Sequence, residues 1–340
     1  MAENTQVAEK KFTTPLSQWS TEITNLVARD YQECNVTFDE YSRKCAQAAV
    51  EKIYALVNTS DKVKSMNDLD TSNLRSIVEQ CASLKLNANA YPRECYFQLR
   101  SVKVNDKWTS QVEFGIEGAG NDAILTKFGK DVAQVYPYWV VKEGDTFIPP
   151  KHKGIEITPP EWEEKGLPNA KAIKVVYPVK LTDGTVQYLI SDRESVKINL
   201  FAHVRNNLMN ETFDICENRY KATAQQKKQI EDRKKPIYDA LRNCKTLDDM
   251  LACEIAQPYM SGAWLDTPES MIIRKMCNNA TRKFPKDYDV MASKAFVELD
   301  ETYQEAQQEV ADNANTEEFI DLDANEVVVD GADTNDSDRQ

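Results

Sequence analysis

The chain has 340 residues, of which 41% are hydrophobic and 9% aromatic, which is enough apolar material to bury a core and excludes wholesale disorder. Its formal net charge is −13, but residues 303–340 hold twelve acidic residues and one arginine, so that residues 1–302 carry only −2. The acidic total therefore does not exclude a nucleic-acid ligand.

The cysteines and the N-terminus indicate the environment of the protein. The eight cysteines form no C-x-x-C pair and are accompanied only by His152 and His203, which argues against a zinc site and favours reduced thiols in the cytoplasm. No basic region followed by an apolar run opens the chain, and no stretch approaches 18 apolar residues, so neither export nor a membrane span is expected. We expect no metal and no cofactor.

The N-terminal half predicts helices followed by a hairpin. Residues 1–30 are expected to form a flexible segment, and apolar spacings of three and four predict helices over 38–57 and from about residue 71. The period then changes to two, which predicts a β-hairpin over 95–114. A glycine-rich turn, a short helix ending near Gly129 and a strand over 132–141 complete a β-β-α-β order.

The C-terminal half predicts a second hairpin followed by helices. The proline-rich residues 144–170 predict a long connection with short strands at best, and residues 172–190 predict a hairpin that turns at Asp183 and Gly184. Ser191 and Glu194 match a capping box, which predicts a helix to about Leu208.

Two further helices are expected before the tail. One is a charged helix over 221–244, interrupted at Pro236, and the other begins with Thr267 and Pro268 and ends at Pro285. The predicted fold is α+β: a β-β-α-β core sheet with a second β-hairpin, flanked by N- and C-terminal helices. It forms one domain over 31–300, followed by a disordered acidic tail over 301–340.

Basic residues concentrate in three predicted regions, where they could contact phosphates. One face of the helix from residue 268 has basic and amide groups without an acid, which suits phosphate binding, and a merely solvated face explains it equally well. Residues 193–205 present a second such face with the same alternative. The third lies on the first hairpin and the helix that follows it. The candidate DNA-binding residues are Arg100, Lys103, Lys107, Lys127, Lys130, Arg193, Lys197, Arg205, Arg274, Lys275 and Arg282.

Aromatic residues are interleaved with the basic residues of the central strands. Basic grooves with aromatic platforms hold single strands without sequence preference, because every base can stack, although strand aromatics more often belong to the core. The candidate base-stacking residues are Tyr96, Trp108, Tyr138 and Trp139, with Tyr136 beside them.

Signals for catalysis are weak. The glycines at 115, 118 and 120 match neither the P-loop nor the dinucleotide fingerprint, and a tight strand-to-helix turn is preferred over a phosphate cradle. Cys95 has no histidine near it in the sequence, and the carboxylates at 161–164 lack metal-ligand spacing. We therefore expect no enzyme activity.

Four stretches in order give the sequence a family resemblance. They are residues 81–89, 112–129, 172–193 and 261–285, each with a loose motif at near-family spacing. In these stretches the chain resembles the RecT family of phage and prophage single-strand DNA annealing proteins. The resemblance implies ATP-independent binding of single-stranded DNA, annealing through a duplex intermediate, and assembly into rings or helical filaments. It also implies a bacterial host cytoplasm, a phage exonuclease partner and a host single-strand-binding protein.

Other functions stay open at this point. An RNA-binding protein would share the basic faces, and an oligomeric phage structural or scaffold protein would share the assembly. An enzyme, such as a Mg²⁺-supported nuclease, is the third alternative. The acidic tail could compete with DNA for the basic groove, dock a partner through residues 317–323, or only solubilise the chain.

Overall fold

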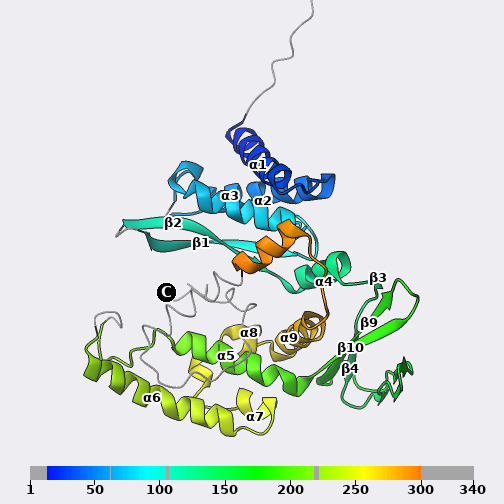
Figure 1. Cartoon of the computed structure of the whole chain (residues 1–340). Coiled ribbons are helices and arrows are strands. Elements are labelled where there is room, and N and C mark those ends of the chain that lie inside the picture. The colour runs from blue at the N-terminus through cyan, green and yellow to red at the C-terminus, as the bar shows by residue number, and fades with distance from the viewer. Residues whose placement is uncertain (1–13, 62, 105–106, 218–221, 300–340) are drawn as a thin grey trace, which may run out of the picture. The chain divides into compact units, whose positions relative to one another are not determined.

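The computed structural model describes residues 14–61, 63–104, 107–217 and 222–299, without the side chains of residues 101–108 (Figure 1). Where one domain was expected over 31–300, this part of the chain divides into two compact units. The first comprises the described residues up to Phe114 together with Asp289–Ala295, and the second comprises Gly115–Tyr288 and the described residues from Phe296. The predicted acidic tail and residues 1–13 lie outside the described residues.

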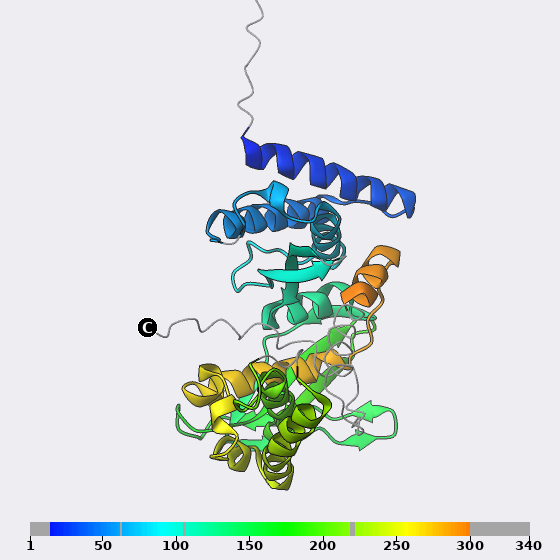
Figure 2. The same ribbon diagram turned by 90° about the vertical axis from the view of Figure 1, so that its left-hand side faces the viewer.

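The first unit packs helices beside a hairpin (Figure 2). Its strands form a two-stranded sheet of their own, as the period-two pattern predicts within each strand. The elements are α1 (Pro15–Glu33), α2 (Glu40–Asn58), η1 (Met66–Asp68), α3 (Thr71–Ser83), β1 (Cys95–Val104) and β2 (Lys107–Ile116).

Helix α1 occupies much of the segment that was expected to be flexible. Thr14 and Ser17 form a capping box, and Pro15 opens the first turn. Ile23, Val27 and Tyr31 recur every four residues and are buried, so this stripe holds α1 in the unit. The stripe is short and is diluted by polar residues, which is why composition alone indicated a loose segment.

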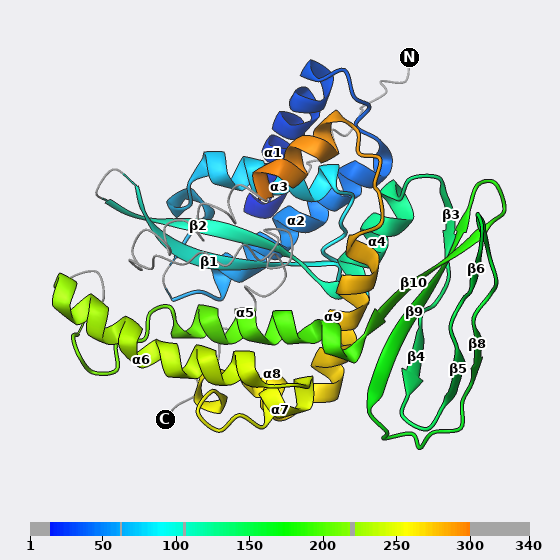
Figure 3. The ribbon, with the colours of Figure 1, turned by 60° about the horizontal axis from the view of Figure 1, so that its bottom comes forward.

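The second unit is built on a four-stranded antiparallel sheet that includes the predicted second hairpin. The strands are ordered β10-β9-β3, and β4 also pairs with β9 (Figure 3). Helix α4 precedes β3. The bounds are α4 (Gly118–Phe128), β3 (Val132–Val135), β4 (Trp139–Lys142), β9 (Ala172–Leu181) and β10 (Val186–Asp192).

The strand predicted over 132–141 is two strands that share one partner. β3 pairs near Val179 of β9 and β4 near Val176. The break falls at Pro137, which has no N–H to donate to a ladder. The mixed α+β class is confirmed. The prediction of a single β-β-α-β sheet is wrong, because β1 and β2 pair with each other and the strands after α4 pair with β9. Period-two patterns predict strands but do not specify their partners.

The proline-rich connection forms the expected short strands, which extend beyond the sheet (Figure 3). At its base Asp145 accepts hydrogen bonds from the backbone N–H groups of Lys142, Gly166 and Lys165 and from the indole N–H of Trp162. These bonds hold the pKa of Asp145 well below its ordinary value. The strands are β5 (Thr146–Ile148), β6 (His152–Lys153), β7 (Glu156–Ile157) and β8 (Glu161–Glu163), paired β5 with β8 and β6 with β7.

The helices after β10 largely follow the prediction, with two differences. The cap after β10 is Asp192, whose carboxylate accepts from the Ser195 N–H at 2.9 Å, in place of the predicted Ser191. Helix α6 continues through Pro236, because Ile230 and Leu241 are buried on either side of it and their packing offsets the lost hydrogen bond. The elements are η2 (Arg193–Val196), α5 (Lys197–Leu208), α6 (Ala224–Asn243), α7 (Leu247–Leu251), η4 (Gln257–Tyr259), α8 (Gly262–Leu265) and α9 (Pro268–Arg282).

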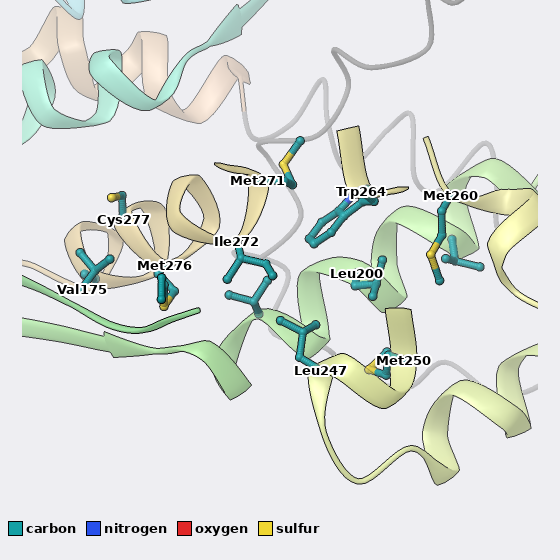
Figure 4. Packing of buried hydrophobic residues seen from close by; sticks show 14 of the residues in the cluster. Val175, Leu200, Leu247, Met250, Met260, Trp264, Met271, Ile272, Met276 and Cys277 are labelled. Carbon is teal, nitrogen blue, oxygen red and sulfur yellow. The ribbon is translucent and has the colours of Figure 1, made fainter. Parts of the chain in front are cut away.

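Helix α9 lies at the centre of the second unit's core. It contacts β9, β10, α4, α8 and η2, so that little of its circumference reaches solvent. Figure 4 shows Met271 and Ile272 of α9 in one cluster with Trp264, Leu200 and Leu247. The helix predicted from Thr267 is therefore confirmed, but it is a core helix rather than a surface helix. Within the described ranges, each helix is too short or too polar to span a bilayer.

Candidate nucleic-acid interface

Helices α4 and α9 end side by side in the second unit (Figure 1). Gly129 and Lys286 form a β-bridge, the Lys130 N–H donates to the Pro285 carbonyl at 2.9 Å, and the Asp287 N–H donates to the Phe128 carbonyl at 2.7 Å. A Cβ on Gly129 would lie 2.4 Å from the Leu125 carbonyl oxygen, so this close turn requires glycine. The two C-terminal ends are thus joined by backbone hydrogen bonds.

This joint brings together basic residues that are far apart in the sequence. Lys127, Lys130 and Lys283 are exposed, whereas Arg282 and Lys286 are half-buried, and the same segments carry the exposed acids Asp131 and Asp287. Three of the five were predicted as DNA contacts. We call the five cations the basic junction: Lys127, Lys130, Arg282, Lys283 and Lys286.

Lys286 closes the end of α9 within the basic junction. Its ammonium group donates to the carbonyls of Phe284 at 2.9 Å, Arg282 at 3.0 Å and Thr281 at 3.2 Å, at and just beyond the end of the helix, where carbonyls lose their regular helical partners. Burial, and then the charge of Arg282, lowers the pKa of Lys286 to about 8. A bound anion would relieve this crowding of positive charge.

An open recess lies along α4 beside the basic junction. Its volume is about 580 Å³, and two of its tyrosines are exposed, Tyr136 at 36% and Tyr138 at 41%. The ring of Tyr138 packs against Tyr177, with centroids 5.1 Å apart. We call it the tyrosine recess; it is lined by Asp122, Thr126, Val135, Tyr136, Pro137, Tyr138 and Tyr177.

The tyrosine recess contains one carboxylate among its lining residues. The Tyr177 hydroxyl donates to Asp122 at 3.0 Å. Burial raises the pKa of Asp122 to about 6, because the partly desolvated carboxylate is disfavoured more than this hydrogen bond favours it. Cys277 of α9 lies near Tyr138 and Tyr177, and burial raises the pKa of its thiol to about 11. This thiol is therefore not a ready nucleophile.

Two of the predicted DNA contacts are interior residues. Arg193 is buried and donates to both oxygens of Glu269 at 2.8 and 3.0 Å and to Asp248 at 2.7 Å. Lys275 is 1% exposed within α9. Their prediction as solvent-facing cations is corrected. Arg193 is held by carboxylates that are distant in the sequence, and Lys275 lies on a helix that packs on several faces, whereas helical periodicity identifies only one apolar face.

The other predicted cations do not belong to the basic junction. Arg274 pairs with Glu117 at 3.4 Å, and Lys197 pairs with Glu194 at 3.6 Å, while Arg205 is half-buried on α5. Arg100 is exposed on β1 in the first unit. The side chains of Lys103, Lys107 and Trp108 lie outside the described residues.

Trp139 and Tyr96, two other predicted stacking residues, are less accessible than Tyr138. Trp139 is half-buried and stacks on Trp162, with centroids 5.7 Å apart and an interplanar angle of 21°. Tyr96 is half-buried on β1 of the first unit. Of the predicted stacking residues whose side chains are described, Tyr138 is thus the most exposed, and the exposed Tyr136 lines the same recess.

Sequence reasoning missed three residues of this region. Lys283 and Lys286 follow the observed end of α9 at Arg282, and the basic run Arg282-Lys283, with Lys286 shortly after it, could have indicated them. No sequence signal indicated Asp122, whose role depends on its tertiary neighbour Tyr177. Comparisons with protein-family models, with curated proteins and with solved structures found no match for this chain.

Proposed function

We propose that the chain binds single-stranded DNA and anneals complementary strands without ATP, as the RecT resemblance implies. The observation that carries the proposal is the basic junction beside the tyrosine recess. Thr126 of the recess and Lys127 of the junction are consecutive on α4, and β3 leads from Lys130 to Tyr136 within six residues. Phosphate-binding and base-stacking groups therefore follow one short path.

Each half of this path supplies a different part of single-strand binding. The cations neutralise backbone phosphates and release counterions, a sequence-independent source of affinity. The exposed tyrosine rings offer stacking surfaces, and stacking tolerates every base because each has a π-face. Annealing needs no covalent step. Two bound strands repel each other less once their phosphates are neutralised, and their base edges stay free.

Assembly and partners belong to the same proposal and rest on the resemblance. Rings or helical filaments would align many such paths, so that one long strand contacts many copies. The phage exonuclease would produce the single strands, and the host single-strand-binding protein would be displaced from them. The acidic tail would compete with DNA, because twelve tethered carboxylates act at high effective concentration.

Binding to labelled oligonucleotides tests the proposal against its alternatives. The full chain should bind a dT 30-mer with an affinity that falls steeply between 50 and 200 mM salt, as phosphate contacts require. Tighter binding to an RNA of equal length would favour an RNA-binding protein. Absence of binding at low salt would contradict the proposal and leave a structural role.

A further inference from the structure

The tyrosine recess suits a flat ligand with an apolar face. Tyr136 and Tyr138 flank Pro137, so two rings that are 36% and 41% exposed lie on one short segment between β3 and β4. The volume of about 580 Å³ lies within the range of ordinary small-molecule pockets. Partly exposed rings at the wall of an open cavity offer a surface on which another ring can stack.

The wall of the recess also holds a carboxylate with unused acceptor positions. Asp122 is half-buried, and its Oδ1 accepts from the Tyr177 hydroxyl at 3.0 Å. Within the described part of the chain its Oδ2 accepts no hydrogen bond, although this oxygen is not a fully buried atom. A carboxylate has about four acceptor positions, so most of them are left for a ligand. Above its pKa of about 6 the group is ionised and can only accept.

A carboxylate beside a stacking surface distinguishes the four bases by their donors. On its Watson–Crick edge guanine presents two adjacent donors, N1–H and the N2 amino group, which match the two oxygens of a carboxylate. Adenine and cytosine present one amino group next to an acceptor nitrogen, and thymine presents one N–H between two carbonyls. A base acceptor that lies against a carboxylate is repelled by it. The recess therefore favours guanine over the other three bases.

We propose that the tyrosine recess is a pocket for guanine, which donates from N1–H and the N2 amino group to the Asp122 carboxylate and stacks its ring on Tyr138. That the guanine belongs to single-stranded DNA rests on the proposed function. Phosphates near such a base lie close to the basic junction, because Lys127 directly follows Thr126 of the recess on α4. The selectivity adds to the sequence-independent affinity. Each copy holds one base, so the other bases of the strand stay free to pair.

Three oligonucleotides of equal length and charge test the pocket at pH 7.5. Two are variants of the dT 30-mer in which every third base is guanine or adenine, so the phosphate contacts are the same in all three. We expect the guanine oligonucleotide to bind roughly five- to tenfold more tightly than the other two, the lower end for a bidentate base contact, because the recess is open to solvent. The adenine oligonucleotide controls for the stronger stacking of a purine. Inosine in place of guanine lacks the N2 amino group and should lose most of the gain.

Asp122→Asn should change which base is preferred. An amide has one acceptor and one donor group, which match adenine, whose amino group adjoins an acceptor nitrogen. We therefore expect the variant to bind the adenine oligonucleotide at least as tightly as the guanine one. Asp131→Asn is the matched control, because it removes one exposed carboxylate outside the recess and asparagine tolerates the positive φ of 57° there. It should change the affinity for all three oligonucleotides alike, and thermal melts check that both variants are folded.

The outcomes distinguish the pocket from the proposed function. If the wild type binds the guanine and adenine oligonucleotides equally within twofold, the pocket is refuted and DNA binding stands. A guanine preference that persists in Asp122→Asn would overturn the role of Asp122. If the wild type binds no DNA, free guanosine and adenosine monophosphates become the probes. A melting temperature that guanosine monophosphate raises more than adenosine monophosphate does, in the wild type but not in Asp122→Asn, then supports the pocket alone. An unchanged melting temperature overturns both.

Discussion

The basic junction and the cluster around Arg193 are both rich in cations, but their surroundings differ. We define the Arg193 cluster as Lys171, Arg193, Asp248 and Glu269. Glu269 accepts from Arg193 through both of its carboxylate oxygens, and Asp248 accepts through one. Asp248 also pairs with Lys171 at 2.6 Å. The junction has five cations and two exposed acids. A cation that is buried against carboxylates, such as Arg193, supports the fold, whereas an exposed cation, such as Lys130 or Lys283, can reach a ligand.

The comparison predicts that the largest effect on stability comes from Arg193. Arg193→Met leaves Glu269 without its cation and leaves Asp248 with only its surface pair to Lys171, and we expect a loss of about 3 kcal/mol in the free energy of unfolding. Lys171→Met breaks a surface pair in the same cluster and should cost at most about 1 kcal/mol. Urea unfolding measures both. Equal losses in the two variants would contradict the distinction between buried and surface pairs.

Charge reversal in the basic junction should weaken DNA binding and leave stability almost unchanged. Lys130→Glu combined with Lys283→Glu changes two exposed side chains, so stability should stay within about 0.5 kcal/mol. Affinity for a dT 30-mer should fall by roughly ten- to a hundredfold at low salt, with a salt slope lower by about two. Lys228→Glu with Lys235→Glu, both exposed on α6, is the control. If that control weakens binding equally, the junction is not the binding surface.

Asp122 should make stability depend on pH. Because its pKa is raised from 3.8 to about 6 in the fold, its contribution to stability is complete below pH 4 and is lost as the pH rises through 6. Asp122→Asn should therefore raise the free energy of unfolding at pH 7.5 by about 2 kcal/mol and flatten its dependence between pH 4 and 7. Thermal melts across this range measure it. Destabilisation by Asp122→Asn at pH 7.5 would contradict this account.

The smallest predicted effect concerns stacking in the tyrosine recess. Tyr138→Ala should weaken binding of the dT 30-mer by about 1 kcal/mol, the lower end for a stacked base, because Tyr177 covers part of the ring. Tyr138→Phe should retain the affinity, since only the hydroxyl is lost. Tyr91 is fully exposed in the first unit, and Tyr91→Ala serves as the matched control. An unchanged affinity in Tyr138→Ala would remove this residue from the binding surface.

Local signals in the sequence predicted most elements, but not how they pair. The second hairpin turned by Asp183 and Gly184, the short helix ending near Gly129 and the helix opened by Pro268 all follow from short-range patterns. The partner of β3 does not, because no local pattern specifies that it pairs with β9.

Less of the candidate site could be predicted, because local patterns do not show which distant residues meet in the fold. Lys127, Lys130 and Arg282 were indicated by charge, but their meeting depends on the bridge between Gly129 and Lys286. Lys275 was misplaced because a helix with several packing partners buries residues outside its apolar stripe. Charge reversal at Lys275 would therefore test folding rather than DNA contact.

Annealing of two complementary fluorescent oligonucleotides tests the central claim most directly. The rate should be compared with and without stoichiometric protein at low and moderate salt, in the wild type and in the Lys130→Glu and Lys283→Glu double variant. The account predicts that the wild type accelerates annealing, that the acceleration fades as salt rises, and that the double variant loses most of it. Tight, salt-sensitive binding without acceleration would contradict the annealing function.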